Sequence, residues 1–456
     1  MPTNQPVSPS PAATVSPPSD TAMPSGAAPP SDTAMGTGGR IAALDVLRGI
    51  AILGTLASNI WIFTAPGGPA AWISDGFATA DPVQRVLQAL ANGKFLGLLT
   101  LLFGVGLELQ YRSMVRRGLP WPGRYALRAG ILFVEGLVHY VLVFEFDVLM
   151  GYAIASLLAA YLIGRSDRVV RAWGGVIAAV YVAGIVGITA LLVATSGGSG
   201  ADGGSGADGG SGADGGASAD AAALSTASWL DQLLLRLTHM DAFRIELILI
   251  VPSATVLFVV GSRLVRAGVF TTSAEGARLR RRLAWAGLGA GIPLNALTTW
   301  AGPDWFLVDR YLVPPLVALG ILALGTTLVG RAQARAQVRE RAWAEAQGRA
   351  RSSRSPVGLF RRGVEAVGRT ALSCYVLQNV LASALCYDWG LGLAGGGAWQ
   401  AVAIWAGISA TLMLVAPLWL RCWPRGPIEL LMHRVYDARR APRRARAASS
   451  ASHSAR

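Results

Sequence analysis

The chain has 456 residues, of which 52% are hydrophobic and 14% are charged, and its mean hydropathy is +0.45. Soluble domains carry about 25% charged residues, so this composition excludes an ordinary soluble protein and indicates an integral membrane protein in a lipid bilayer. The net charge is +14, but the arginines lie in short gaps between apolar runs, so we expect no nucleic-acid partner.

The first 39 residues contain nine prolines and no Lys or Arg. They have no basic region followed by an apolar run, which argues against a signal peptide. We predict a disordered tail that buries too little apolar surface to fold. The sequence leaves open whether translation starts at Met1 or Met35.

Ten apolar segments follow, each near the ~20 residues that cross a bilayer. The fold class that we predict is therefore all-α, a polytopic helical membrane bundle. Only Phe146 separates the third segment from the fourth, which predicts a tight hairpin there. The ten segments are 44–63, 94–111, 126–145, 147–164, 172–195, 244–264, 283–300, 310–330, 367–387 and 399–420.

Every second loop between these segments is rich in arginine, including nine arginines from Arg331 to Arg362. The positive-inside rule then places both termini in the cytoplasm. The predicted regions are a disordered tail (1–39), a first membrane half (40–195), a flexible outer loop with SGADGG repeats (196–242), helices six to eight (243–330), a basic cytoplasmic loop (331–366), helices nine and ten with a C-terminal motif (367–436) and a basic tail (437–456).

Polar residues inside apolar segments are costly and mark candidate sites. The first segment opens with LDVLRG, where Asp45 and Arg48 are three residues apart and so share a helix face. The pair either binds an anionic substrate from the cytosol, since Arg suits phosphate, or is a local ion pair that anchors the helix.

The third segment reads FVEGLVHYVLVFEFD, and Glu135 and His139 lie four residues apart on one helix face. A carboxylate one turn away can orient an imidazole and raise its basicity. We therefore predict His139 as a general base about 20 Å from the cytoplasmic end, with Glu135 as its catalytic partner. The alternative is a histidine that is hydrogen-bonded inside the bundle. Asp147 at the hairpin either binds a polar substrate or caps the next helix.

The ninth segment, GRTALSCYVLQN, is the most polar. Tyr375, Gln378 and Asn379 share one face and either line a substrate cavity or join helices through hydrogen bonds. Arg369 at its cytoplasmic end is a candidate second anion contact. No second ligand stands near His139 at metal-like spacing, so we predict no metal site.

Five motifs in order carry a family resemblance: LDVLRGIAILG, GKFLGLLTLLFGVGLELQ, GLVHYVLVFEFDVLMGYAI, GRTALSCYVLQN and RGPIELLMHRV. Together, between Arg40 and Tyr436, they resemble the YeiB-type, domain-of-unknown-function 418, family of bacterial membrane proteins. The resemblance implies a multi-pass protein of the bacterial inner membrane.

The LDVLRG opening is also similar to that of the transmembrane acyltransferase superfamily, which includes the heparan-alpha-glucosaminide acetyltransferases and the acyltransferase-three enzymes. This likeness implies acyl-CoA as a cytosolic co-substrate, a hydroxyl or amine acceptor on the far side, and roles for Arg48 in binding and His139 in transfer. Two alternatives stay open: a small-molecule transporter or exporter, and a non-catalytic membrane protein.

Overall fold

The computed structural model describes residues 42–66, 68–69, 81–198, 228–347 and 356–438. Within these ranges the regular structure is helical and no strand forms, which confirms the predicted all-α membrane bundle. The predicted tail at 1–39, the SGADGG repeats and nearly all of the predicted tail at 437–456 lie outside the described residues.

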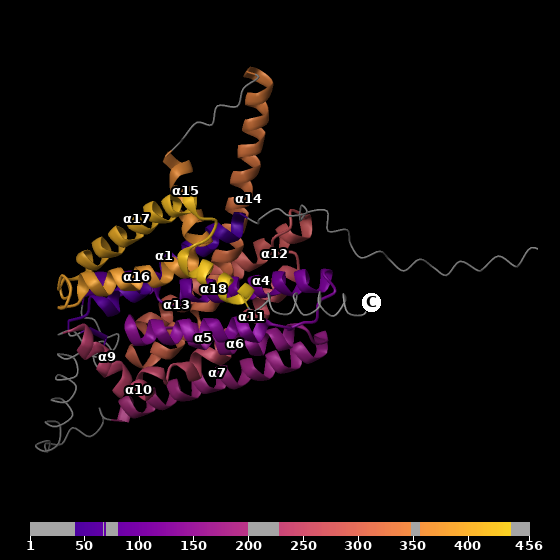
Figure 1. Cartoon of the computed structure of the whole chain (residues 1–456). Coiled ribbons are helices and arrows are strands. Elements are labelled where there is room, and N and C mark those ends of the chain that lie inside the picture. The colour runs from indigo at the N-terminus through magenta and orange to yellow at the C-terminus, as the bar shows by residue number, and fades with distance from the viewer. Residues whose placement is uncertain (1–41, 67, 70–80, 199–227, 348–355, 439–456) are drawn as a thin grey trace, which may run out of the picture. The chain divides into compact units, whose positions relative to one another are not determined.

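The first half of the chain forms six described helices (Figure 1): α1 (Ala42–Phe63), α3 (Pro82–Ala91), α4 (Lys94–Arg116), α5 (Tyr125–Leu142), α6 (Leu149–Ile163) and α7 (Asp167–Gly198). The second half contains α9 (Trp229–Thr238), α10 (Met240–Arg244), α11 (Leu247–Arg266), α12 (Ala274–Ala284), α13 (Gly291–Trp300), α14 (Pro314–Gln347), α15 (Pro356–Arg369), α16 (Ala371–Cys386), α17 (Ala398–Cys422) and α18 (Pro427–Ala438). Two π-helical stretches, Trp285–Ala290 and Val308–Leu312, precede α13 and α14.

Helical structure covers each of the ten predicted segments, but not all of these helices have the length of a span. By length and composition, seven described helical stretches are long and apolar enough to cross a membrane. Helices α6 and α16 are apolar but shorter, and the segment predicted at 283–300 changes from π-helix to α-helix near Gly291. The bundle is thus a multi-pass one, and the count of ten spans stays a prediction.

Glycines let several helices approach closely. A Cβ on Gly104 of α4 would lie 2.2 Å from the carbonyl oxygen of Phe258 on α11, and one on Gly261 would lie 2.2 Å from the Leu101 oxygen. Small residues commonly allow such close approach between membrane helices. The tight α4–α11 contact therefore depends on these glycines.

The chain between α5 and α6 turns at residues 143–148, where the sequence predicted a hairpin. The two helices pack side by side (Figure 1). The Phe144 ring stacks on Phe63 at the end of α1, with 4.6 Å between centroids. Phe63 also contacts Tyr387, just after α16, at 5.8 Å. Three helix ends thus meet at this hairpin, which positions the site described below.

The stretch predicted as a basic loop at 331–366 is helical in most of its described part. Helix α14 continues to Gln347, and α15 packs along α1 with Val364 and Val367 buried. Arg361 and Arg362 of α15 are exposed. These two charges led to the prediction of a loop between membrane helices.

Candidate functional site

His139 is 2% exposed and lies on α5, one turn before the hairpin. Its Nδ1 is 2.9 Å from Oδ1 of Asp147. A carboxylate accepts hydrogen bonds, so the shared proton resides on Nδ1 of the imidazole. Nε2 then carries the lone pair of the ring, which is the arrangement of a histidine that acts as a base.

Asp147 has two functions at the turn. While Oδ1 meets His139, Oδ2 accepts the backbone N–H of Leu149 at 2.9 Å and that of Met150 at 3.3 Å. These N–H groups at the start of α6 have no partner inside the helix. Asp147 therefore caps α6, one of the two alternatives that the sequence left open, and substrate binding by Asp147 stays a prediction. The cap fixes the carboxylate against the imidazole.

Helix α16 supplies the other side of the cluster. The side-chain nitrogen of Asn379 lies 3.2 Å from Nε2 of His139, and the Tyr375 hydroxyl donates to Oδ1 of Asp147 at 3.5 Å. Both side chains are buried. The polar face predicted for α16 thus contacts α5 and the hairpin. Asn379 and His139, which meet there, are 240 residues apart in the sequence.

The carboxylate that pairs with His139 is Asp147 rather than the predicted Glu135. Both oxygens of Glu135 are buried and have no hydrogen-bond partner in the described structure. The spacing of four residues put Glu135 on the correct face, but the turn after α5 brings Asp147 back onto the ring.

Helix α16 also carries buried polar atoms without partners. Both amide atoms of Gln378 and the amide oxygen of Asn379 make no hydrogen bond with the described residues, although both side chains are 0% exposed. Leaving such groups unpaired costs about 1–3 kcal/mol each. Unsatisfied groups of this kind call for an explanation, such as a ligand or water at the site.

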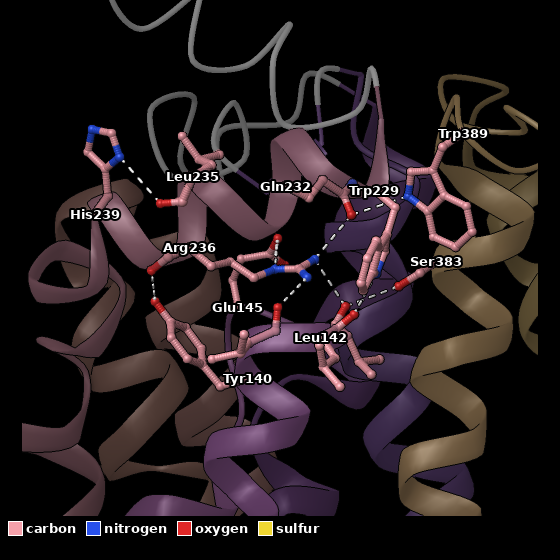
Figure 2. A network of polar contacts seen from close by, with 12 residues as sticks. Tyr140, Leu142, Glu145, Trp229, Gln232, Leu235, Arg236, His239, Ser383 and Trp389 are labelled. Atoms are coloured by element: carbon pink, nitrogen blue, oxygen red, sulfur yellow. Dashed lines mark hydrogen bonds and ion pairs between the residues drawn. The ribbon is translucent and has the colours of Figure 1, made fainter.

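A buried arginine of α9 is hydrogen-bonded to the hairpin between α5 and α6 (Figure 2). Arg236 of α9 is 0% exposed, and its Nε donates to Oε1 of Glu145 at 2.8 Å. Its terminal nitrogens donate to the carbonyl oxygens of Val141 and Val143 at 3.1 and 3.2 Å. The Tyr140 hydroxyl in turn donates to the Arg236 carbonyl at 2.6 Å. These contacts fix the segment between His139 and Asp147.

Arg244 of α10 supports the same segment. It donates to the backbone oxygen of Asp147 at 3.0 Å and to that of Glu145, and its guanidinium carbon lies 4.0 Å from the centre of the Tyr140 ring. Neither Arg236 nor Arg244 was assigned a role from the sequence. The available signal was their position, since both are arginines in a loop predicted to face outward, where the positive-inside rule expects few.

Glu429 of α18 is another residue with no role assigned from the sequence, although it lies in RGPIELLMHRV. Its Oε1 accepts the backbone N–H groups of Leu372 and Ser373 at 2.9 and 3.3 Å. Its other oxygen meets the Ser373 hydroxyl. The carboxylate therefore caps α16, the helix that carries Tyr375 and Asn379.

The predicted cytoplasmic anion contacts lie on other parts of the bundle. Asp45 and Arg48 pair on α1, with Nη1 of Arg48 3.5 Å from Oδ1 of Asp45. Nε of Arg369, at the end of α15, is buried without a hydrogen-bond partner in the described residues. The ion pair is confirmed, and anion binding by Arg48 and Arg369 stays a prediction.

A second buried polar cluster surrounds Asp309 in the π-helix before α14. Oδ1 accepts from Asn295, Thr298 and Thr299 at 2.8, 3.1 and 2.6 Å. Oδ2 accepts from Asn92 at 3.0 Å, in the break between α3 and α4. The sequence did not identify this cluster.

In the described part of the chain, no group of three or more His, Cys, Asp or Glu side chains is arranged to hold a metal ion.

Comparison with known proteins gives one family and two relatives. The family described as "Protein of unknown function (DUF418)" matches residues 264–439. That range includes α16 and Glu429, whereas His139 and Asp147 lie before it. No solved structure matches the chain.

The uncharacterized protein YeiB of Escherichia coli (strain K12) is 31% identical over 135 residues, which cover 28% of this chain and 33% of the relative. The uncharacterized protein YxaH of Bacillus subtilis (strain 168) is 30% identical over 125 residues, 26% of this chain and 31% of the relative. The chain thus spans about a third of the length of each relative. Residues 264–439 are thus similar to the DUF418 family, and the two relatives agree with the YeiB-type resemblance of the motifs.

Proposed function

We propose that this protein is a membrane-embedded acyltransferase that moves an acyl group from cytosolic acyl-CoA to a hydroxyl or amine acceptor. One observation carries the proposal: Asp147 holds Nδ1 of His139 at 2.9 Å, next to unpaired amide groups on α16. A carboxylate, an imidazole and free hydrogen-bond donors are the components of acyl-transfer sites.

In the proposed reaction, Nε2 of His139 removes the proton of the acceptor as its oxygen or nitrogen attacks the thioester carbonyl. The tetrahedral intermediate then expels the thiolate of CoA, and the imidazolium returns the proton to that sulfur. Asp147 stabilises the imidazolium through Nδ1.

The acceptor must replace Asn379 at Nε2, since the amide nitrogen occupies that position at 3.2 Å. The amide nitrogens of Asn379 and Gln378 are then candidates to donate to the developing oxyanion. Gln378 suits this role because both of its amide atoms lack partners in the described structure.

On the cytoplasmic side, Arg48 and Arg369 are the proposed contacts for the phosphates of CoA. Arg48 is oriented by Asp45 and its side chain is 30% exposed. Charge-assisted hydrogen bonds from a guanidinium are well suited to phosphate. Asp45 is then a positioning residue for the donor rather than a direct contact.

The experiment uses purified protein in proteoliposomes with radiolabelled acetyl-CoA and an extract of bacterial envelope material as the source of acceptor. Transfer of label from CoA is measured for the wild type, His139→Ala and the control His239→Ala. His239 is exposed at the end of α9, so its loss should leave the rate unchanged.

We expect His139→Ala to reduce transfer to background while the unfolding temperature stays near the wild-type value. Transfer at the wild-type rate in His139→Ala, or equal losses in both histidine variants, contradicts the proposal.

A second function, transport, is favoured by the Asp309 cluster. It joins two interrupted helical stretches: Gly93, with φ of 67°, follows α3, and the π-helix precedes α14. Both breaks lie inside candidate spans, Pro82–Arg116 and Pro303–Arg339. Interrupted helices form the binding sites of many transporters.

The test of this alternative is uptake of labelled amino acids, sugars or nucleosides into proteoliposomes without an acyl donor. Uptake by the wild type that is abolished in Asp309→Asn would support transport.

A further inference from the structure

Glu135 lies at the interface between α5 and α16, one turn before His139. The side-chain nitrogen of Asn379 lies 3.2 Å from Nε2 of His139, and the Ser383 hydroxyl donates to the Val143 carbonyl oxygen at 3.4 Å. Both contacts join residues that are 240 positions apart, so the two helices run parallel at this interface. Glu135 shares the face of His139. It therefore lies on the side of α5 that α16 covers, one turn closer to the start of the helix.

Three hydrogen-bond acceptors at this interface have no partner in the described structure. They are both carboxylate oxygens of Glu135 and the amide oxygen of Asn379, and all three are buried. Asn379 is 0% exposed, and the nitrogen of the same amide contacts His139, so its oxygen also lies beside the imidazole. A ligand that satisfies these atoms must donate hydrogen bonds rather than accept them.

The charges around Glu135 are negative. The neighbouring carboxylates are those of Asp147, at the turn, and of Glu429 on α18, which packs against α5. Among the described residues, no ion pair joins Glu135 to an arginine, lysine or histidine. A buried carboxylate without a counter-ion is destabilising, and a bound cation restores the lost stability. The site therefore favours a positively charged ligand.

A primary ammonium group meets both requirements. It has three N–H donors, no acceptor and one positive charge, whereas a hydroxyl has a single donor and no charge. Acylation also requires an ammonium to lose two protons and a hydroxyl to lose only one. Two proton acceptors of the described site match this requirement: the Glu135 carboxylate, and Nε2 of His139, whose Nδ1 is held by Asp147.

We propose that the acceptor is a primary amine, which binds as the ammonium between Glu135 and Asn379 beside His139. The inference rests on the proposed acyl transfer and selects the amine over the hydroxyl acceptor. Glu135 removes the first proton, and the free amine attacks the thioester carbonyl while Nε2 of His139 takes the second proton. The carbon–sulfur bond then breaks, and the imidazolium returns its proton to the thiolate. The products are an amide, the thiol of CoA and one proton on Glu135.

The test uses the proteoliposome assay with radiolabelled acetyl-CoA and envelope extract. One portion of the extract is treated with formaldehyde and cyanoborohydride, which methylate primary amines, and the other is mock-treated. The labelled product is then exposed to alkaline hydroxylamine, which cleaves esters and leaves amides intact. Glu135→Gln removes the charge at nearly constant shape. The matched control is Glu275→Gln, at an exposed position of α12.

We expect the wild type to label only the mock-treated extract and to form a product that resists hydroxylamine. Glu135→Gln should lower transfer roughly 100-fold near pH 7, as for the loss of a proton acceptor. This deficit should shrink between about pH 7 and pH 9, because the fraction of free amine in solution rises about tenfold per pH unit below an amine pKa of about 10. Glu275→Gln should transfer at the wild-type rate.

Binding without reaction is measured by thermal unfolding of the full chain with n-butylamine or n-butanol at equal concentration. We expect butylamine to raise the unfolding temperature of the wild type above its value with butanol, because the ammonium pairs with the Glu135 carboxylate. Glu135→Gln should abolish the difference between the two probes, and Glu275→Gln should keep it.

A product that hydroxylamine cleaves, or equal labelling of the amine-blocked extract, overturns the amine acceptor and leaves acyl transfer standing. Equal transfer by Glu135→Gln and the wild type at pH 7 overturns the role of Glu135, and so does a deficit that stays constant with pH. Absence of transfer to every extract contradicts the proposed function. The two butyl probes then decide the binding site separately, and an equal effect of both on the wild type overturns it.

Discussion

Two buried polar clusters in this bundle differ in how completely they are hydrogen-bonded. Asp309 accepts four hydrogen bonds, from Asn92, Asn295, Thr298 and Thr299. Around His139, by contrast, Glu135 and Gln378 have buried polar atoms with no partner among the described residues. Both clusters join helices that are far apart in the sequence.

This difference in hydrogen bonding indicates which cluster stabilises the fold and which one binds a ligand. A fully bonded buried network stabilises one arrangement, and a ligand that enters it must displace one of its hydrogen bonds. A network with unpaired groups loses stability that a ligand can restore, since binding then satisfies them. We therefore expect substitutions at Asp309 to act mainly on stability and those near His139 mainly on activity.

The largest expected effect is on catalysis. Asp147→Asn should lower acyl transfer by roughly 10³-fold or more, because an amide no longer fixes the imidazole tautomer or stabilises the imidazolium. An amide oxygen can still cap α6, so the unfolding temperature should change little. Transfer kinetics and thermal unfolding of the same preparation provide the measurement. A large loss of stability with normal kinetics would assign Asp147 to the fold alone.

The next effect is on stability at the saturated cluster. Asp309→Ala should destabilise the protein by about 3 kcal/mol or more, because four donors lose their acceptor in a buried site. Thermal unfolding in detergent measures the change, with Asp304→Ala, at a partly exposed position, as the control. If Asp309→Ala unfolds like the wild type but loses uptake of a solute, the cluster is a transport site instead.

The Arg236 contact should contribute a comparable or smaller amount. Arg236→Met leaves the Glu145 carboxylate buried and unpaired, which costs about 3 kcal/mol. The double variant Arg236→Met, Glu145→Leu should recover part of the loss, since no buried charge remains. Arg165→Met removes an exposed arginine and should change stability by less than about 1 kcal/mol. No recovery in the double variant would mean that the backbone contacts of Arg236 dominate.

Gln378→Leu should have the smallest effect on folding, so it best separates a catalytic role of the amide from a structural one. Replacing an unpaired buried amide with an apolar side chain should leave stability unchanged or raise it by about 1 kcal/mol. Transfer should fall roughly 10-fold to 100-fold, as for loss of one oxyanion donor. A destabilised Gln378→Leu with normal transfer would show that the amide is a structural element.

The sequence predicted most of the helices because apolar runs report burial in lipid directly. It also identified His139 and Asn379, since polar side chains stand out inside such runs. It did not identify α15 as a packed helix. Arg361 and Arg362 lower the hydrophobicity of the segment, although Val364 and Val367 form a buried face.

The pairing of His139 could not be predicted for another reason. Spacing along one helix favours Glu135, but the actual partner depends on how the chain turns after α5. Likewise, Arg236 lies in a loop whose docking onto the hairpin is a tertiary contact with no local pattern. Helix periodicity therefore predicts which side chains share a helix face. Their hydrogen-bond partners on other elements are known only from the folded structure.

A structure of the full chain in lipid nanodiscs with a non-hydrolysable acyl-CoA analogue tests whether the unpaired groups around His139 form a ligand site. We predict that the carbonyl-bearing end lies within hydrogen-bond distance of Nε2 of His139 and that the Gln378 amide contacts it. An analogue bound elsewhere, with the His139–Asn379 contact intact and Gln378 still unpaired, would show that this cluster is not the ligand site.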